Sequence, residues 1–591
     1  MEEESIRSLK RMAKAKEKTQ TGSHGVTSGI DDLGDDLMQN ILSRLPALSF
    51  ASAACVSRSW NSLCNSLLSS PRLSSAVSFN PSLENAVIEV FEKVFSEPIR
   101  PHFALASIGP SFSLQAALYL IDKKLGSRIP VIVNVSEGVI GRNVQTDQFV
   151  EVQWEVTTEE EHLGAVSQVE NVNRGIILTV GFLPGLKAHI IPLFSQDKGP
   201  GSLLLDEFVM DIRESASAVS DSTSPAGIIL FADRETDIKP VLQTIEYAFS
   251  EDTFIVGDGG SQFLYQSYSG NNTTWQTDST CAAVGLLFAR DRNKPGIGEI
   301  QFHVMLSTGI SPLGNMYKAV SVKSNENSTW LTASRETVRE HLDGQAILED
   351  IYEELGDRIQ YPAFYIGVTK RRRRSVGKEK ARWMQFHEFH EVLGGDEEYL
   401  FVNSVGIKTR DPFRFYISDS RAALSSCNRV SDMLKDLKLD CDSINNHASP
   451  SVAHCDKRKV FGGIVFSCCG RGDSFFGHPG IDSSPFLKNF PGVTLGGTYC
   501  AGEIGRGKLN LYDQDIEEGG SVICSQHVYS AVYLVMRGNL SPFGCTGAKR
   551  GRPAPGEHRE ERETGRRKSQ GRPGHLTEMG RLFPILEGPM E

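Results

Sequence analysis

The sequence LGDDLMQNILSRLP, at residues 33–46, opens the first segment with a regular apolar pattern. Its apolar residues recur every four positions, at Leu33, Leu37, Ile41 and Leu45. This spacing predicts a helix with one apolar stripe, which Pro46 is expected to close because proline cannot continue a helix.

The next segment extends this pattern into a small helical unit. We expect Ser49 to cap a second helix that carries Ala53, Ala54 and Val56, and the following SRSWNSLC to present Trp60 and Leu63. Three short helices in about forty residues bury too little apolar surface to be stable alone. The unit is therefore expected to pack on its own chain or to dock on a partner.

LGDDLMQNILSRLP followed by ACVSRSWNSL resembles an F-box, with its leucine-rich helix, Leu-Pro stop and Val-x-x-x-Trp element. The resemblance implies that seven residues face the Skp adaptor of a cullin-RING ubiquitin ligase: Leu33, Leu37, Ile41, Leu45, Pro46, Val56 and Trp60. Gly34 departs from the family pattern, which usually has proline just inside the first helix, and glycine there costs up to about 1 kcal/mol of helix stability. The alternative is a local three-helix cap packed on this protein's own domain.

The middle of the chain has an α/β pattern. GIILFAD (227–233) is a short β-branched run, DIKPVLQTIEYAF (237–249) has helical spacing, and DTFIVGDGG (252–260) is a second strand-like run that ends in glycines. Strand, helix and strand in about thirty residues is the length that a parallel crossover needs.

The same order of elements recurs near the C-terminus. GGIVFSCCGRG (462–472) is a strand that ends in glycines, SSPFLKNF (483–490) a short helix, and VTLGGTYCAGEIG (493–505) another strand. Further strands are predicted at residues 130–135, 174–182, 281–290 and 299–306, and a helix at residues 344–355. The predicted fold class is mixed α/β, with an N-terminal helical module.

FGGIVFSCCGRG and PGVTLGGTYCAGEIG resemble the FIST domain, a two-part α/β module of sensory signal-transduction proteins and of a subset of F-box proteins. GISPLGNMYKAVSV (309–322) and LDGQAILEDIYEEL (342–355) stand in the expected order between its parts. The resemblance implies an F-box at residues 30–73 and FIST parts at residues 101–340 and 341–533. A polar leader (1–29) and a basic tail (538–591) are expected to be disordered.

The FIST resemblance also implies a domain that captures a substrate or senses a small ligand such as an amino acid. Ligands of open α/β sheets bind beyond the carboxyl ends of strands. We therefore expect a pocket lined by Arg471, Gly472, Tyr499, Gly502 and Glu503, with the arginine for a carboxylate and the glutamate for an ammonium group. Two alternatives stay open: Arg471 and Glu503 pair with each other, or the glycines serve only turns.

The composition narrows the partners and the compartment. A net charge of -11 over 591 residues argues against a dedicated nucleic-acid binder. No secretory signal and no apolar stretch of membrane-spanning length is present, which predicts the cytoplasm, the nucleus or both. The basic run KRRRRSVGKEKAR (370–382) fits either a nuclear-localisation or acidic-partner patch or a solvated loop.

No catalytic motif has its required context. GDSFFG (472–477) lacks the G-x-S-x-G elbow, GDGGS (257–261) lacks the P-loop lysine, and no cysteine and histidine spacing matches a zinc site. The sequence predicts no cofactor, no metal and a non-catalytic adaptor that brings a protein substrate to a ligase. The alternative function is a stand-alone sensor of a small, amino-acid-like molecule, with the helices as a packing module.

Overall fold

The computed structural model describes most of the chain between residues 34 and 539. The described residues are 34–155, 173–195, 203–269, 272–276, 281–294, 299–325, 328–335, 341–356, 359, 362–446, 458–507 and 523–539. The predicted leader and all of the predicted tail beyond Asn539 lie outside these residues. Gly538 and Asn539, which were assigned to the tail, belong instead to a strand.

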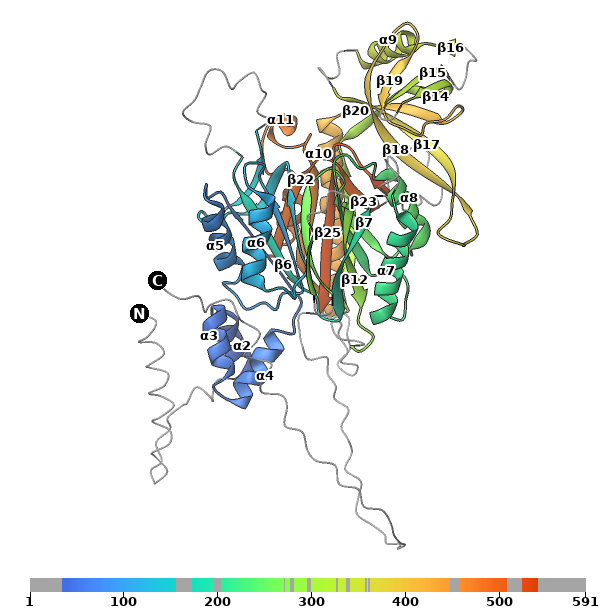
Figure 1. The fold of residues 1–591 in the computed structure, drawn as a ribbon. Helices are drawn as coiled ribbons and strands as arrows, with labels where there is room; N and C mark the ends of the chain where they lie inside the picture. The colour runs from blue at the N-terminus through green and yellow to red at the C-terminus, as the bar shows by residue number, and fades with distance from the viewer. Residues whose placement is uncertain are drawn as a thin grey trace, which may run out of the picture.

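Three helices come first and stand apart from the rest of the chain (Figure 1). They are α2 (Asp35–Ser43), α3 (Ala47–Ala54) and α4 (Arg58–Leu67). The predicted helical module is therefore confirmed, and a larger body that is rich in sheets follows it.

The body contains three six-stranded sheets within the described residues. The first has the order β1 (Arg72–Ser78), β6 (Ile176–Phe182), β2 (Phe103–Ile108), β3 (Val131–Val135), β10 (Phe263–Ser269) and β11 (Asn272–Gln276). The second has the order β24 (Ile523–Gln526), β23 (Glu503–Gly507), β9 (Phe254–Asp258), β8 (Gly227–Ala232), β12 (Cys281–Arg290) and β7 (Leu186–Phe194). The third has the order β13 (Gln301–Thr308), β25 (Ser530–Asn539), β21 (Arg458–Cys468), β22 (Thr494–Cys500), β4 (Gly138–Arg142) and β5 (Phe149–Gln153).

Each of these sheets contains one parallel pair joined by helix. β2 and β3 are joined through α6 (Leu114–Leu125), and β8 and β9 through α8 (Lys239–Ala248). β21 and β22 are joined through α11 (Asp473–Phe476) and α12 (Ser484–Asn489). Both predicted strand–helix–strand units are confirmed. Since parallel strands of one crossover end at the same edge, each sheet has a carboxyl edge suited to a ligand site.

The sheets share one core and carry helices outside it. Inward side chains such as Phe103, Phe231 and Phe466 come from the three different sheets and meet in a common cluster. Helices α5 (Leu83–Val94) and α6 pack on the first sheet, and α7 (Leu205–Val219) and α8 pack on the second (Figure 1). Helices α10 (Ser420–Asn446) and α12 pack on the third.

A closed β-barrel is inserted between β13 and α10. Its sheet has the order β14 (Ile310–Ser324), β20 (Pro412–Ser418), β17 (Phe364–Arg374), β18 (Arg382–Gly395), β19 (Leu400–Asn403), β15 (Thr329–Arg335) and β16 (His341–Leu342). Because β14 pairs with both β20 and β15, the sheet closes on itself. The predicted helix α9 (Gly344–Leu355) is confirmed and packs Ile347 and Ile351 into the barrel core. The predicted domain boundary at 340/341 falls between β15 and β16.

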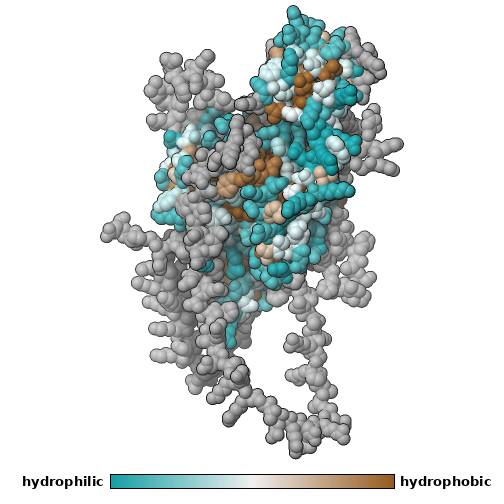
Figure 2. Space-filling view, turned by 45° about the vertical axis from the view of Figure 1, so that its right-hand side comes forward, coloured by the Kyte–Doolittle hydropathy of each residue, from teal (hydrophilic) through white to brown (hydrophobic). Residues whose placement is uncertain are grey.

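The barrel and the three N-terminal helices lie at opposite ends of the body (Figure 1). Figure 2 shows hydrophobic areas on the barrel and on the neighbouring part of the body, within a largely hydrophilic surface. The large apolar side chains exposed on the barrel include Tyr352 and Leu393.

The basic run at residues 370–382 is largely ordered in the β17–β18 hairpin rather than forming a solvated loop. Lys370 is buried and donates from Nζ to Glu388 Oε2 at 2.6 Å, and Arg372 Nη2 donates to Asp411 Oδ2 at 2.7 Å. The hairpin also reaches α8, where the Tyr247 hydroxyl donates to the Lys380 carbonyl at 3.1 Å. Two basic side chains of the run are thus held in ion pairs within the fold, whereas Arg371, Arg373, Lys378 and Lys380 are exposed.

Candidate functional site

The three N-terminal helices enclose a small core of their own. It consists of Met38, Leu42, Phe50, Ala53, Ala54, Leu63, Cys64 and Leu68, all buried. Ser57 caps α4 by accepting a hydrogen bond from Trp60 N at 3.1 Å. Among the described residues this cluster includes none from the body, which argues against a cap that packs on its own domain.

Helix α2 is apolar on two sides. Met38 and Leu42 point into the small core, whereas Leu37 and Ile41 are 59% and 48% exposed. Val56, in the turn after α3, is 60% exposed. Leu37 and Ile41 thus widen the apolar face of α2 beyond the part that its own core covers, and this exposed part has the character of an interface.

The other predicted adaptor residues divide into three groups. Pro46 is exposed, while Leu45 and Trp60 are half-buried and pack against the small core. Leu33 lies outside the described residues. The predicted single stripe is therefore accompanied by a second one, formed by Met38 and Leu42, which faces the small core. Sequence analysis missed these two residues, although their four-residue spacing indicated such a stripe.

Three local expectations are corrected. Gly34 is the N-cap of α2, outside the helix, with φ -59°. Glycine at an N-cap costs only a few tenths of a kcal/mol relative to a good cap, so the predicted weakness is small. Helix α2 ends at Ser43, so Pro46 does not close it. Pro46 is the N-cap of α3, and Ser49, which was expected to be that cap, lies inside the helix.

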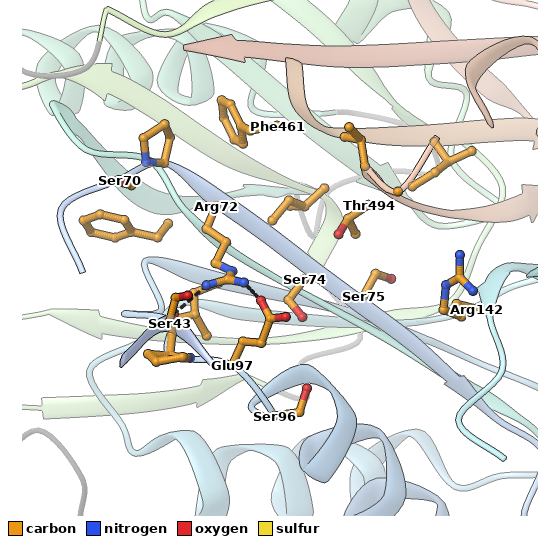
Figure 3. A pocket seen from close by; sticks show the side chains of 18 of the residues that line it. Ser43, Ser70, Arg72, Ser74, Ser75, Ser96, Glu97, Arg142, Phe461 and Thr494 are labelled. Carbon is orange, nitrogen blue, oxygen red and sulfur yellow. Dashed lines mark hydrogen bonds and ion pairs between the residues drawn. The ribbon is translucent and has the colours of Figure 1, made fainter. Parts of the chain in front are cut away.

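A cavity of about 530 Å³ lies where the helices join the body (Figure 3). At its centre Arg72 forms an ion pair with Glu97 and donates from Nη1 to the Pro98 carbonyl at 3.2 Å. Lys93 and Arg142, also in its wall, both lie near Asp147, at 2.7 and 3.6 Å. Since most of the basic groups here already have acidic partners, this cavity is best explained as a structural joint.

In the body, the predicted ligand residue Arg471 is fully buried. Its Nε and Nη2 donate to the Asp482 carboxylate at 3.1 and 2.6 Å, and its Nη1 donates to the Tyr529 carbonyl at 2.9 Å. Burial disfavours the charge on Arg471, but the Asp482 carboxylate outweighs burial and raises the pKa of the guanidinium. The arginine is therefore committed to Asp482 and does not pair with Glu503, so the geometry argues against a carboxylate clamp.

Glu503 is also fully buried, at the start of β23. Its Oε1 accepts a hydrogen bond from Ser530 N at 2.8 Å. Burial, reinforced by Cys468, raises the pKa of Glu503 well above its usual range. Burial thus favours the neutral form of this carboxyl group, which makes it a poor partner for an ammonium ligand.

The remaining predicted ligand residues have structural partners. Tyr499 is buried and donates to Glu151 Oε2 at 3.2 Å. Gly472 has φ 107°, and a Cβ there would meet the Gln153 side chain. The Gly502 carbonyl accepts from Gly259 N at 2.6 Å. The two predicted glycines thus serve a strained turn and a close approach between loops.

Two acidic residues of this region were missed by sequence analysis. Asp482 lies eleven residues after Arg471, and no sequence motif indicates that the two residues pair. Asp258 ends β9 and lies opposite Glu503 in the β23–β9 pairing. It is buried, and burial raises the pKa of Asp258 to about 7. The sequence signal for Asp258 was its position at the end of a predicted strand, where ligand sites of α/β sheets lie.

Replacing Asp258 by asparagine is expected to change how stability depends on pH. The folded chain holds a proton on Asp258 up to about pH 7, whereas the unfolded chain releases it near 3.8. This group therefore makes the wild type lose stability as the pH rises from about 4 to 7, by roughly 2–4 kcal/mol. Thermal unfolding midpoints at pH 5 and pH 8 should show a larger loss for the wild type than for Asp258→Asn. Parallel pH profiles would contradict the assignment.

A larger cavity, of about 1110 Å³, opens at the carboxyl edges of the first two sheets. Its wall is formed by the segments that follow β3, β8 and β9, at residues 135–137, 233–237 and 260–262. The segments are held together by Val135 N, which donates to the Gln262 carbonyl at 2.9 Å, and Ser261 N, which donates to the Ala232 carbonyl at 3.0 Å. The expected pocket was at the carboxyl ends of β21 and β22 in the third sheet, so this cavity lies at other strand ends and contains none of the five expected residues.

Other classes of site are not found in the described part of the chain. No group of three or more histidine, cysteine, aspartate or glutamate side chains is placed there to hold a metal ion. None of the described helices combines the length and the apolar character needed to cross a membrane.

Comparison with known proteins agrees with the geometry of the N-terminal helices. Residues 30–70 match the F-box domain. The chain is 41% identical over 514 residues to an F-box/LRR-repeat protein of Arabidopsis thaliana, covering 85% of this chain and 93% of the relative. That name also mentions leucine-rich repeats, whereas the described body and barrel here are built of three sheets and one sheet, respectively. The match to nearly the whole relative, together with the F-box helices, shows that the chain belongs to the F-box protein family.

Proposed function

We propose that this protein is the substrate-recognition subunit of an SCF-type (Skp, cullin, F-box) E3 ubiquitin ligase. The observation that carries the proposal is the exposure of Leu37, Ile41 and Val56 on a module that already has its own core. These apolar side chains, together with the exposed Pro46, form the surface that we propose for the Skp adaptor. Through the adaptor the chain joins the cullin-RING ligase.

The body and the barrel are proposed to capture the protein that is ubiquitinated. The resemblance of the body to a FIST domain supports a capture or sensing role. Exposed apolar side chains on the barrel, Tyr352 and Leu393, supply contact area at the end of the molecule away from the F-box (Figure 1). In this function no residue of the chain performs chemistry, because the gain in rate comes from holding the substrate near the ubiquitin-loaded enzyme.

Co-purification with the Skp adaptor tests the ligase function. The full-length chain and the adaptor, expressed together, should elute as one complex and should recruit the cullin subunit. Failure of the wild-type chain to bind the adaptor would remove this function. Substrates can then be identified as proteins that, under proteasome inhibition, are ubiquitinated when bound to the wild type but not when bound to the Ile41→Asp variant.

A second candidate function is a sensor of a small, amino-acid-like molecule. The cavity of about 1110 Å³ at the carboxyl edges of two sheets favours it, because it is large enough for such a ligand. In that case the chain would not form a complex with the Skp adaptor. Its affinity for the ligand would therefore be the same with and without the adaptor.

A further inference from the structure

The hairpin of β17 and β18 is fixed to the body through one of its two faces. It reaches from the barrel along α8 (Figure 1). Successive side chains of a strand point to opposite faces, and those of one face are turned towards α8. Arg374 donates a hydrogen bond to Gln243 of α8, and Met384 packs in the core cluster around that helix. Near the tip, Glu379 forms an ion pair with Arg213 of α7 at 2.5 Å. The hairpin is thus held in place, and its other face has a fixed orientation.

This outer face of the hairpin is basic and carries a large aromatic side chain. Arg371 and Arg373 are exposed there, and Trp383, the cross-strand neighbour of Arg373, is 62% exposed. The Arg371 guanidinium lies 5.6 Å from the centre of the Trp383 ring, as in a cation–π contact. Lys378 and Lys380 add two exposed cations at the tip. We call these five side chains the outer hairpin face.

The four cations of the outer hairpin face form no ion pair within the described part of the chain. The ion pairs of the hairpin involve Lys370, Arg372 and Glu379 instead. Residues 370–385 contain eight basic residues and one acidic residue, in a chain whose net charge is -11. A local positive field of this kind, on a protein that is acidic as a whole, favours an anionic partner.

The side chains of the outer hairpin face suit an acidic peptide. Arginine and tryptophan are enriched among the residues that contribute most to binding at protein interfaces, and a guanidinium can hold a carboxylate through two parallel hydrogen bonds. Arg371 and Arg373 are two positions apart in one strand, which corresponds to about 6.7 Å. Alternate side chains of an extended peptide have the same spacing. Two carboxylates at alternate positions can therefore meet both guanidinium groups, while an apolar neighbour covers Trp383.

We propose that the outer hairpin face captures an acidic, extended segment of the substrate protein, with two carboxylates at alternate positions beside an apolar side chain. The proposal rests on the proposed substrate-receptor function and names the chemistry of the segment that is captured. The barrel that carries the hairpin and the F-box helices lie at opposite ends of the body (Figure 1). A segment bound to the hairpin therefore leaves the surface proposed for the adaptor uncovered.

The test measures peptide binding to the full-length chain in complex with the Skp adaptor. The probe is a peptide with blocked ends, Ser-Leu-Ser-Glu-Ser-Glu-Ser-Leu-Ser, whose leucines and glutamates point to one side when it is extended. A matched peptide with glutamine in place of both glutamates should bind about tenfold more weakly or worse. Added salt should weaken the glutamate peptide, because exposed charges are screened. Equal binding of the two peptides would overturn the proposal.

Variants locate the site. The double variant Arg371→Glu, Arg373→Glu should weaken the glutamate peptide about tenfold or more, and Trp383→Ala should weaken it too. The unfolding midpoint and the adaptor complex should stay unchanged, because these side chains are exposed. The control Lys123→Glu, Arg128→Glu makes the same change of charge on exposed residues at the end of α6 and just after it, and it should leave binding unchanged. Unchanged binding in the hairpin double variant, or equal weakening in the control, would exclude this face.

Further outcomes separate the classes of partner and the two levels of the argument. Single-stranded nucleic acid also binds arginine and aromatic side chains, so an oligothymidylate is the competing probe. Tighter binding of the oligothymidylate than of the peptide, lost in the hairpin double variant, would assign the face to nucleic acid and overturn the proposal. If no peptide binds while the adaptor complex remains intact, the hairpin proposal fails and the substrate-receptor function stands. If the wild-type chain forms no adaptor complex, the receptor function itself fails.

Discussion

Replacing Ile41 by aspartate is expected to weaken binding to the Skp adaptor by about 30-fold or more, because a charge then enters the centre of an apolar interface. Ile41 is 48% exposed, and it lies outside the small F-box core. The thermal unfolding midpoint should therefore stay within a few degrees of the wild type, since surface changes cost little stability. Calorimetric titration of the adaptor into each purified chain measures the affinity.

Two further variants make this result specific. Ile88 is 40% exposed on α5 of the body, so Ile88→Asp adds the same charge to another apolar surface and should leave adaptor binding unchanged. Leu42 is fully buried in the F-box core, and Leu42→Ala should cost about 2–5 kcal/mol there. It should thus reduce adaptor binding only together with unfolding of the helices. Wild-type affinity in Ile41→Asp would contradict the proposed surface.

The local elements of the fold were predictable because local sequence determines them. The strand–helix–strand unit from Gly227 to Asp258 has apolar strands, helical spacing between them and glycines at its end. The closed barrel was not predicted. Its closure depends on pairing between β14 and β15 and between β14 and β20, and the second pairing joins residues about a hundred positions apart. No repeat or turn motif in the sequence reveals such a contact.

In the candidate sites, too, local sequence predicted some features, whereas those that depend on tertiary packing were not predictable. The periodic residues Leu37 and Ile41 predicted an apolar face, but only packing shows that Met38 and Leu42 face the core instead. In the body, the strand-end rule predicted a pocket after β21 and β22, whereas the larger cavity lies after β3, β8 and β9. The rule also could not show that Arg471 is paired, because its partner is a carboxylate from a loop with no sequence signal.

The Arg471–Asp482 pair leads to the second large expected effect. Both side chains are fully buried, and Asp482 Oδ2 also accepts a hydrogen bond from Ser467 Oγ at 2.6 Å. Replacing Asp482 by asparagine keeps the shape of the side chain but leaves the buried guanidinium charge uncompensated. Removing one partner of a buried ion pair costs about 3–5 kcal/mol. We expect a drop of several degrees or more in the unfolding midpoint of the body, measured by calorimetry.

The double variant Arg471→Met, Asp482→Leu decides what the pair does. If the pair is structural, apolar side chains of similar volume should recover most of the lost stability, because both charges and their desolvation cost are removed together. Substrate capture should then also be retained, since the guanidinium is enclosed by Asp482 and the Tyr529 carbonyl and does not reach a ligand. If the double variant recovers its stability but no longer captures the substrate, Arg471 would instead be a ligand-binding residue. Stability that stays low in the double variant, with the single Asp482→Asn variant unaffected, would contradict the pairing itself.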